Sequence, residues 1–133
     1  MRRIMYEDCN NNAFFLKELF VQVQALVDSE ISWSISNLDF IPVDKGDFIG
    51  GVPGIEMEEL YHFQKRILDE HKIIVTHNIF MHLLENIRTI DVGKFETFIG
   101  GKQLKITIFD GDIIEIDGKM ENKLHITGAI NCV

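Results

Sequence analysis

The chain has little cysteine, and we expect neither a secretory signal nor a membrane-spanning segment in it. Its two cysteines, Cys9 and Cys132, lie near opposite ends and form no CxxC pair or other zinc-ligand spacing. Free thiols are the expected state, and a bridge between the two cysteines is the alternative. No apolar run is long enough to cross a bilayer, and acidic residues and asparagines follow Arg2 and Arg3 where a secretory signal would be apolar. We therefore expect a cytoplasmic protein.

Positive charge is also scarce. Thirteen lysines and arginines stand against 21 aspartates and glutamates, which gives a formal net charge of −8. Such a charge repels phosphate backbones, so nucleic-acid binding is a poor hypothesis. It favours basic partner proteins, and the simpler interpretation is that it serves solubility alone.

The glycine-rich segment 44–54 lacks what a phosphate-binding loop requires. It has no G-K-[ST] sequence, Pro53 removes one backbone amide, and the next helix begins with Glu56, Glu58 and Glu59, where a bound anion would lie. Like charges there oppose phosphate. We predict that the glycines provide positive φ angles in a connection and that no nucleotide cofactor binds.

Candidate catalytic and metal-binding residues are few. His77, His82 and Glu85 are a conceivable transition-metal set, although a spacing of five does not place the two histidines on one helical face, and ordinary surface or capping histidines are the simpler interpretation. Residues 110–118 lack the D-x-D-x-D-G spacing of a calcium loop. The four serines lie outside any G-x-S-x-G context. The sequence therefore predicts no catalytic residue, cofactor or metal ligand, and an enzyme is the less favoured class.

The periodic patterns predict one α+β domain over residues 1–133. "ISWSIS" at 31–36 alternates apolar and serine residues, as in a half-buried strand that continues to Phe40. Asn11 or Asn12 is expected to cap the first helix. We predict helices around Leu16–Val27, Leu60–Leu68 and 79–86, and strands at "RRIMYE", at "KIIVT" (buried on both faces) and in four runs after Arg88.

The C-terminal runs predict a β-meander with a defined register. A turn at Gly100-Gly101 places Phe95 opposite Ile106 and Glu96 opposite Lys105. A three-residue loop at 109–111, with Gly111 left-handed, separates apolar from charged side chains on every rung. This register pairs Ile106 with Ile114, Leu104 with Ile116 and Lys105 with Glu115.

About three helices are expected to cover one face of this mostly antiparallel sheet. The predicted core comprises Phe20, Trp33, Ile35, Phe63, Ile67, Ile74, Leu83, Phe95 and Ile106.

The opposite face of the meander supplies the candidate binding site. A solvated sheet face is normally polar, yet Phe98 and Ile113 fall on it among Glu96, Glu115 and Asp117. Apolar anchors inside a charged rim are typical of a partner-binding patch. Coverage by another element of the chain is the alternative.

The order of these features resembles a family of small uncharacterised proteins of spore-forming bacteria. The parallels are "RRIMYE", a helix, the strand "WSIS", a second helix before a strand, and the late hairpin "FDGDIIEID". The resemblance implies a cytoplasmic bacterial protein and brings no catalytic residues. The glycine-rich segment departs from it.

Two functional hypotheses follow. The first is a non-enzymatic acidic interaction protein, such as an immunity- or antitoxin-type inhibitor that binds a basic protein. The second is a small-molecule-binding or catalytic domain that uses 44–54 as a lid, with Asp44 and Asp47 beside it.

Overall fold

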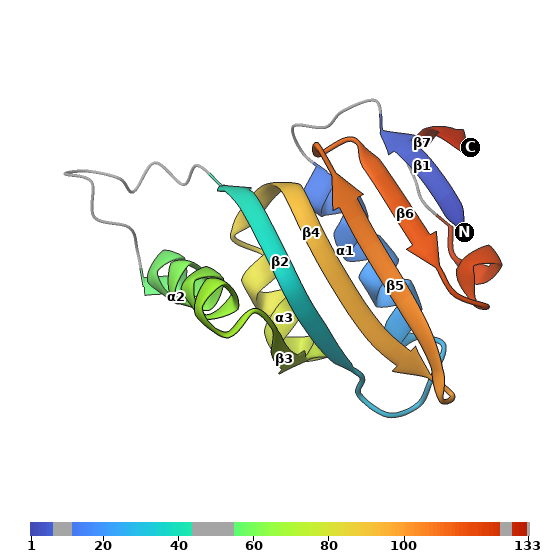
Figure 1. The fold of residues 1–133 in the computed structure, drawn as a ribbon, viewed down its shortest axis with the longest axis horizontal. Coiled ribbons are helices and arrows are strands. Elements are labelled where there is room, and N and C mark those ends of the chain that lie inside the picture. Colours follow the sequence, from blue (N-terminus) through green and yellow to red (C-terminus); the bar gives the residue numbers. More distant parts are fainter. Residues whose placement is uncertain (7–11, 44–54, 126–128, 133) are drawn as a thin grey trace.

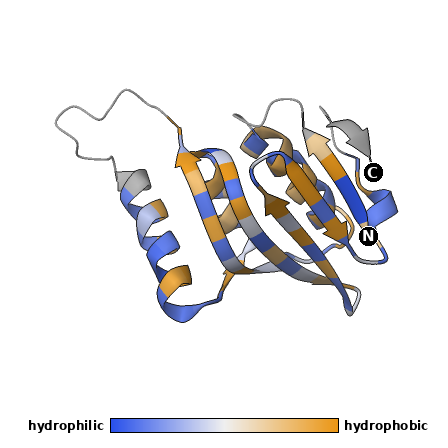
Figure 2. Ribbon diagram, turned by 45° about the horizontal axis from the view of Figure 1, so that its top comes forward, coloured by the Kyte–Doolittle hydropathy of each residue, from blue (hydrophilic) through white to orange (hydrophobic). Residues whose placement is uncertain are grey.

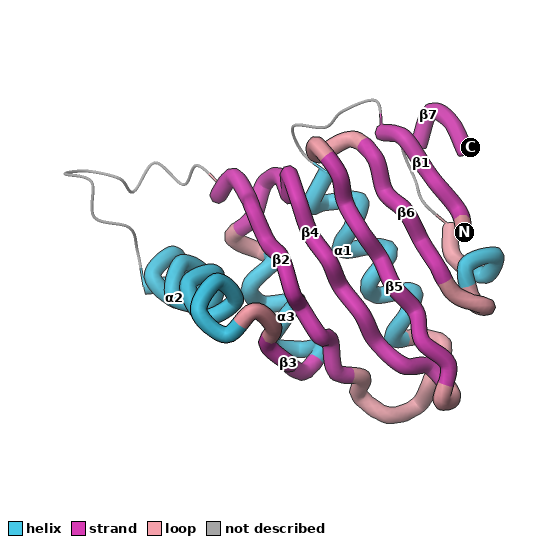
Figure 3. Tube along the Cα trace, viewed as in Figure 1, coloured by secondary structure: helices cyan, strands magenta, loops and turns pink. Residues whose placement is uncertain are grey.

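A computed structural model describes residues 1–6, 12–43, 55–125 and 129–132. In the described part of the chain, every strand joins one sheet and the helices lie between strands in the sequence (Figure 1; Figure 3). The elements are β1 (Arg2–Tyr6), α1 (Asn12–Gln24), β2 (Ser32–Pro42), α2 (Ile55–Glu70), β3 (Ile73–Thr76), α3 (His77–Leu84), β4 (Ile87–Ile99), β5 (Lys102–Phe109), β6 (Ile113–Asp117), the 3-10 turn η3 (Glu121–Lys123) and β7 (Ala129–Cys132).

The sheet has seven strands in the order β3-β2-β4-β5-β6-β1-β7, and each neighbouring pair is antiparallel. Consecutive strands β4, β5 and β6 form the predicted meander. The first strand joins the far side of that meander, where Ile4 lies opposite Ile114. The α+β class and the predicted meander are therefore confirmed.

The helices cover one face of the sheet. Figure 1 shows α1 and α3 behind the strands, with α1 packed on β4 and α3 packed on α1, β2 and β3. Helix α2 lies beside β2, where Gln64 Nε2 donates to the carbonyl of Leu38 at 3.1 Å. The sheet consequently has a covered face and a face on which no described helix lies.

A cluster of four aromatic rings joins the helices to the sheet. The ring of Phe20 on α1 lies 4.9 Å from Trp33 on β2, 5.0 Å from Phe80 on α3 and 5.2 Å from Phe95 on β4, each edge-on. Gly93 leaves the space that the Phe95 ring fills, because a Cβ there would meet that ring at 2.4 Å. Eight of the nine predicted core residues are buried.

Ile74 is the exception, and the prediction for "KIIVT" was wrong. Strand β3 is an edge strand, and its alternation buries Ile73 but leaves Ile74 69% exposed. Leu68 also departs from the predicted stripe of α2: it is exposed because it follows buried Ile67 and so points about 100° away around the helix.

The β5–β6 register was predicted with the correct faces but the wrong partners. Ile106 pairs with Ile116, and Glu115 lies opposite Thr107 rather than Lys105. The turn occupies 110–112 instead of 109–111, which moves every pair by two residues and keeps each side chain on its face. Across Gly100-Gly101 the predicted register is confirmed.

The proposed helix cap at Asn12 is also corrected. Asn12 is the first residue of α1 and is buried, and its side chain bonds to the backbone of Ile90 and Gly111 instead of to its own helix. Asn11 lies outside the described residues.

Candidate functional site

The candidate site is the outer sheet face, which we define as the side of the sheet opposite α1 and α3. Each strand alternates between the two faces, and Figure 2 shows the resulting apolar and polar bands along β2 and β4. The outer sheet face carries Phe98, Ile113, Glu96, Glu115 and Asp117, as the sequence predicted. The structure divides these five residues among three places.

Phe98 belongs to a corner of this face that reaches the edge strand. Its side chain is 64% exposed and lines a hollow of about 350 Å³ together with Ile74. Ser34 pairs with Ile74 on one side and with Glu96 on the other. The small side chain of Ser34 therefore lies between the larger side chains of Ile74 and Glu96, which line the hollow. The remaining lining residues are Ser32, Lys72, Thr97 and Gln103. We name this place the Ile74–Phe98 corner.

Glu115 and Asp117 line a second, central hollow of about 230 Å³ over β5 and β6. Arg3 donates from Nε to Glu115 Oε1 at 2.9 Å, and a second guanidinium nitrogen contacts the same oxygen. Glu115 is therefore held by the neighbouring strand β1 and not by Lys105. Lys105 lies opposite Asp117, and its Nζ is 3.8 Å from Glu96 Oε1.

Ile113 lies at the other end of the face. It pairs with Phe109 on β5 and with Met5 on β1, and both of these side chains are partly exposed. Phe98 lies opposite Gln103, six residues from Phe109 along β5, so the two predicted anchors are about 20 Å apart along that strand. They form the ends of one face and not a single patch.

The charges between these two ends nearly cancel. The central part of the outer sheet face alternates acidic and basic side chains: Asp39, Glu96, Glu115 and Asp117 with Arg3, Lys94 and Lys105. The strong net negative charge of the chain is thus a property of the whole molecule and is not concentrated on this face.

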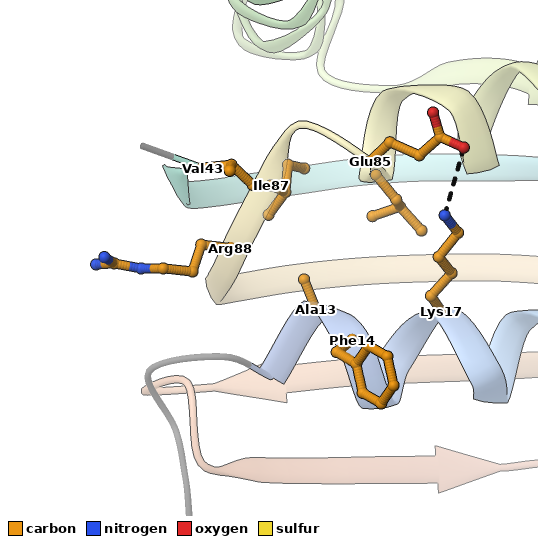
Figure 4. A pocket seen from close by; sticks show the side chains of 8 residues that line it. Ala13, Phe14, Lys17, Val43, Glu85, Ile87 and Arg88 are labelled. Atoms are coloured by element: carbon orange, nitrogen blue, oxygen red, sulfur yellow. Dashed lines mark ion pairs between the residues drawn. The ribbon is translucent and has the colours of Figure 1, made fainter. Parts of the chain in front are cut away.

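A groove of about 410 Å³ lies on the helical side, between α1 and the start of β4. Figure 4 shows Lys17 reaching from α1 toward Glu85, with Nζ and Oε1 3.5 Å apart. Both side chains are well exposed, so this ion pair adds little stability. Phe14 and Val43 also line the groove, and Val43 is the last described residue before segment 44–54.

The histidines do not form the metal set considered from the sequence. His77 is buried, and its Nδ1 accepts a hydrogen bond from Trp33 Nε1 at 3.0 Å, whereas His82 is exposed and lies 3.7 Å from Glu85. Within the described ranges, no three His, Cys, Asp or Glu side chains gather as ligands of a metal ion would. The glycine-rich segment with Asp44 and Asp47 lies outside the described residues, as does Cys9.

Sequence reasoning missed three apolar residues of the outer sheet face: Ile74, Met5 and Phe109. Ile74 was hidden because a continuous apolar run has no alternation that distinguishes an edge strand from a central one. Phe109 was predicted to lie in the turn, whereas in the structure it pairs with Ile113. Met5 became recognisable only once β1 was paired with β6.

Comparison with protein-family models, curated proteins and solved structures gives no match to this chain. None of the helices in the described ranges has the length and apolar character needed to cross a membrane.

Proposed function

We propose that the protein is a non-enzymatic interaction protein that binds a basic partner protein through its outer sheet face, in the manner of an immunity- or antitoxin-type inhibitor. The supporting observation is the composition of that face. It has apolar side chains exposed at both ends, the Ile74–Phe98 corner and the group around Ile113, with charged residues between them.

In this proposal the apolar ends affect the dissociation rate of the partner, and the net charge affects its association rate. Exposed Phe98 and Ile74 lose contact with water when a partner covers them, which slows dissociation. The net charge of −8 attracts a basic protein over long range and increases the rate of encounter. Because the charges on the face nearly cancel, short-range selectivity comes from the positions of Glu96, Glu115 and Asp117 and not from their sum.

The first test compares two phenylalanines that are equally exposed. Phe98→Ala removes an anchor of the proposed site, and Phe14→Ala removes a side chain that is 66% exposed on α1. Immobilised wild-type protein and both variants are incubated with lysate of the source cell at increasing salt concentrations. We expect a basic protein to be retained by wild type and Phe14→Ala and to dissociate at least about tenfold faster from Phe98→Ala.

Equal retention on all three proteins, or capture of an acidic protein alone, contradicts the proposed site. A Phe98→Ala protein that aggregates places this residue in the core and rejects both its exposure and its role.

The second test compares how acidic residues on the outer sheet face and acidic residues elsewhere affect the association rate. Glu115→Gln with Asp117→Asn, and Glu58→Gln with Glu59→Gln on α2, change the net charge by the same amount. With the captured partner, the first pair should lower the association rate and its salt dependence more than the second pair. An equal reduction would show that only the net charge matters.

A small-molecule-binding domain is the second candidate. The groove beside α1 favours it, because its volume of about 410 Å³ falls within the usual range for ligand pockets. A rise in melting temperature with a metabolite fraction of the lysate, lost in Phe14→Ala, would favour this function, because Phe14 lines the groove and is exposed. No catalytic assignment follows from the described residues of the groove.

A further inference from the structure

The hydrogen bond between Trp33 and His77 has a fixed direction. The indole N–H of Trp33 can only donate, so Nδ1 of His77 must carry a free lone pair. Both side chains are buried, with His77 only 5% exposed and Trp33 fully covered. The pair therefore requires the neutral imidazole, with its proton on Nε2.

His77 occupies the point where the edge strand becomes a helix. Strand β3 ends at Thr76 and α3 begins at His77 without a connecting residue. The N–H of His77 donates to the carbonyl of Ile31 at 2.9 Å, and the N–H of Asn78 donates to Glu30 Oε1 at 2.9 Å. Thr76 provides no side-chain cap. The start of α3 is thus attached to the turn before β2 through these bonds, which follow directly on the pairing of Ser32 with Thr76.

Protonation of Nδ1 disrupts this arrangement directly. Two N–H donors would face each other at 3.0 Å, and a positive charge would be buried at the N-terminus of α3, where the helix dipole disfavours it. Burial lowers the pKa of His77 below its ordinary value of 6.5, and the carboxylate of Glu30 opposes this effect. Glu30 lies in the turn before β2, and its carboxylate, which accepts from the N–H of Asn78, is the charged group that acts on His77.

We propose that the Trp33–His77 hydrogen bond is an acid-sensitive latch: protonation of His77 releases β3 and α3 from the sheet, while the β4–β5–β6 meander retains its pairing. Because Ile74 lies on β3, opening would also remove one wall of the Ile74–Phe98 corner.

The direction of the pH effect follows from the lowered pKa. The open state binds a proton with the ordinary pKa of 6.5, and the closed state binds one only at lower pH. The stabilisation of the closed state is therefore complete above pH 6.5 and is lost as the pH falls from 6.5 toward the pKa of the closed state. Within that window, the population of the open state rises about tenfold per pH unit.

The test is amide hydrogen exchange between pH 7.5 and pH 5, corrected for the intrinsic pH dependence of exchange. Wild type is compared with His77→Asn, whose side-chain oxygen occupies a position close to that of Nδ1 and does not titrate. His82→Asn is the matched control, because His82 is exposed and makes no bond to Trp33.

We expect residues 73–84 to exchange about tenfold faster per pH unit below pH 6.5 in wild type and His82→Asn, and to show no such acceleration in His77→Asn. Residues 102–109 should remain protected in all three.

Equal acceleration in wild type and His77→Asn would overturn the latch, and so would simultaneous loss of protection in β5. If His77→Asn does not fold, the latch is tested instead by following the imidazole NMR resonances of wild type as the pH is lowered. A His77 signal that titrates together with faster exchange in 73–84 supports the latch. A His77 signal that titrates while exchange in 73–84 stays unchanged rejects it.

Discussion

At the scale of single residues, Asn12 joins three parts of the fold, namely α1, β4 and the β5–β6 turn. Its Nδ2 donates to the carbonyls of Ile90 and Gly111, and its Oδ1 accepts from the N–H of Ile90, each at 2.7 Å. One buried amide side chain thereby satisfies three backbone groups on β4 and on the β5–β6 turn. Buried polar groups without partners are costly, so Asn12 is a structural requirement of this corner.

Replacing Asn12 tests this role. Asn12→Ala leaves the three backbone groups without their partner and should lower the free energy of unfolding by about 2–4 kcal/mol. Asn122→Ala is the matched control, since Asn122 is exposed and should change that free energy by less than about 0.5 kcal/mol. Urea denaturation measures both variants, and equal midpoints for Asn12→Ala and wild type would contradict the assignment.

At the scale of elements, the β5–β6 hairpin shows how contacts outside a hairpin set its register. Asp110 and Gly111 both have positive φ, at 52° and 75°, in the turn between Phe109 and Ile113. The N–H of Gly111 donates to the carbonyl of Asp91 at 2.9 Å, and Asn12 holds the Gly111 carbonyl. These bonds fix the turn from the side of β4 and α1, so the pairing is specified by more than the two strands.

Disulfide trapping distinguishes the observed register from the one expected from the sequence. In a background of Cys9→Ser and Cys132→Ser, Thr107→Cys with Glu115→Cys places the thiols directly opposite each other. Such pairs have Cα atoms about 4.5–5.5 Å apart, within the range of a disulfide, whereas the diagonal pair of Lys105→Cys with Glu115→Cys is about 7–8 Å apart. Mild oxidation should close the first pair nearly completely and the second pair much less. Faster closure of the second pair would favour the rejected register.

At the scale of the whole molecule, the four-ring cluster connects α1, β2, α3 and β4 in one core. Trp33 is fully buried within it, and it is the single tryptophan of the chain. Its fluorescence therefore reports on the packing of both helices against the sheet. The outer sheet face is not part of this core, because the helices lie on the other side of the strands (Figure 1).

The emission of Trp33 at pH 7.5 should lie to the blue of free tryptophan, as expected for an indole shielded from water. Its loss in urea should coincide with the loss of far-ultraviolet circular dichroism, because a domain with one core unfolds cooperatively. Native emission at the wavelength of free tryptophan would contradict the burial of Trp33. Separate midpoints for the two signals would show that the cluster is not the common core.

The sequence by itself determined the class of the fold and the face on which most side chains lie. Alternation in "ISWSIS" and in the C-terminal runs places Trp33, Ile35, Phe95 and Ile106 inside, and the structure confirms their burial. The position of Phe98 on the opposite face was determined in the same way, whereas its exposure was decided by the structure, because coverage by another element was the alternative. Periodicity carries this information because the direction of a side chain depends only on the local backbone.

The tertiary structure alone decided which strands are neighbours and how they are aligned. A shift of two residues preserves every face, so alternation does not distinguish Ile114 from Ile116 as the partner of Ile106. The exposure of Ile74 follows from the position of β3 at the edge, and the place of Met5 on the candidate surface follows from the pairing of β1 with β6. These contacts join residues far apart in the chain, and no local pattern encodes such a contact. The face of the five candidate residues was therefore predictable, whereas the contribution of Ile74, Met5 and Phe109 and the division into two separated apolar ends were not.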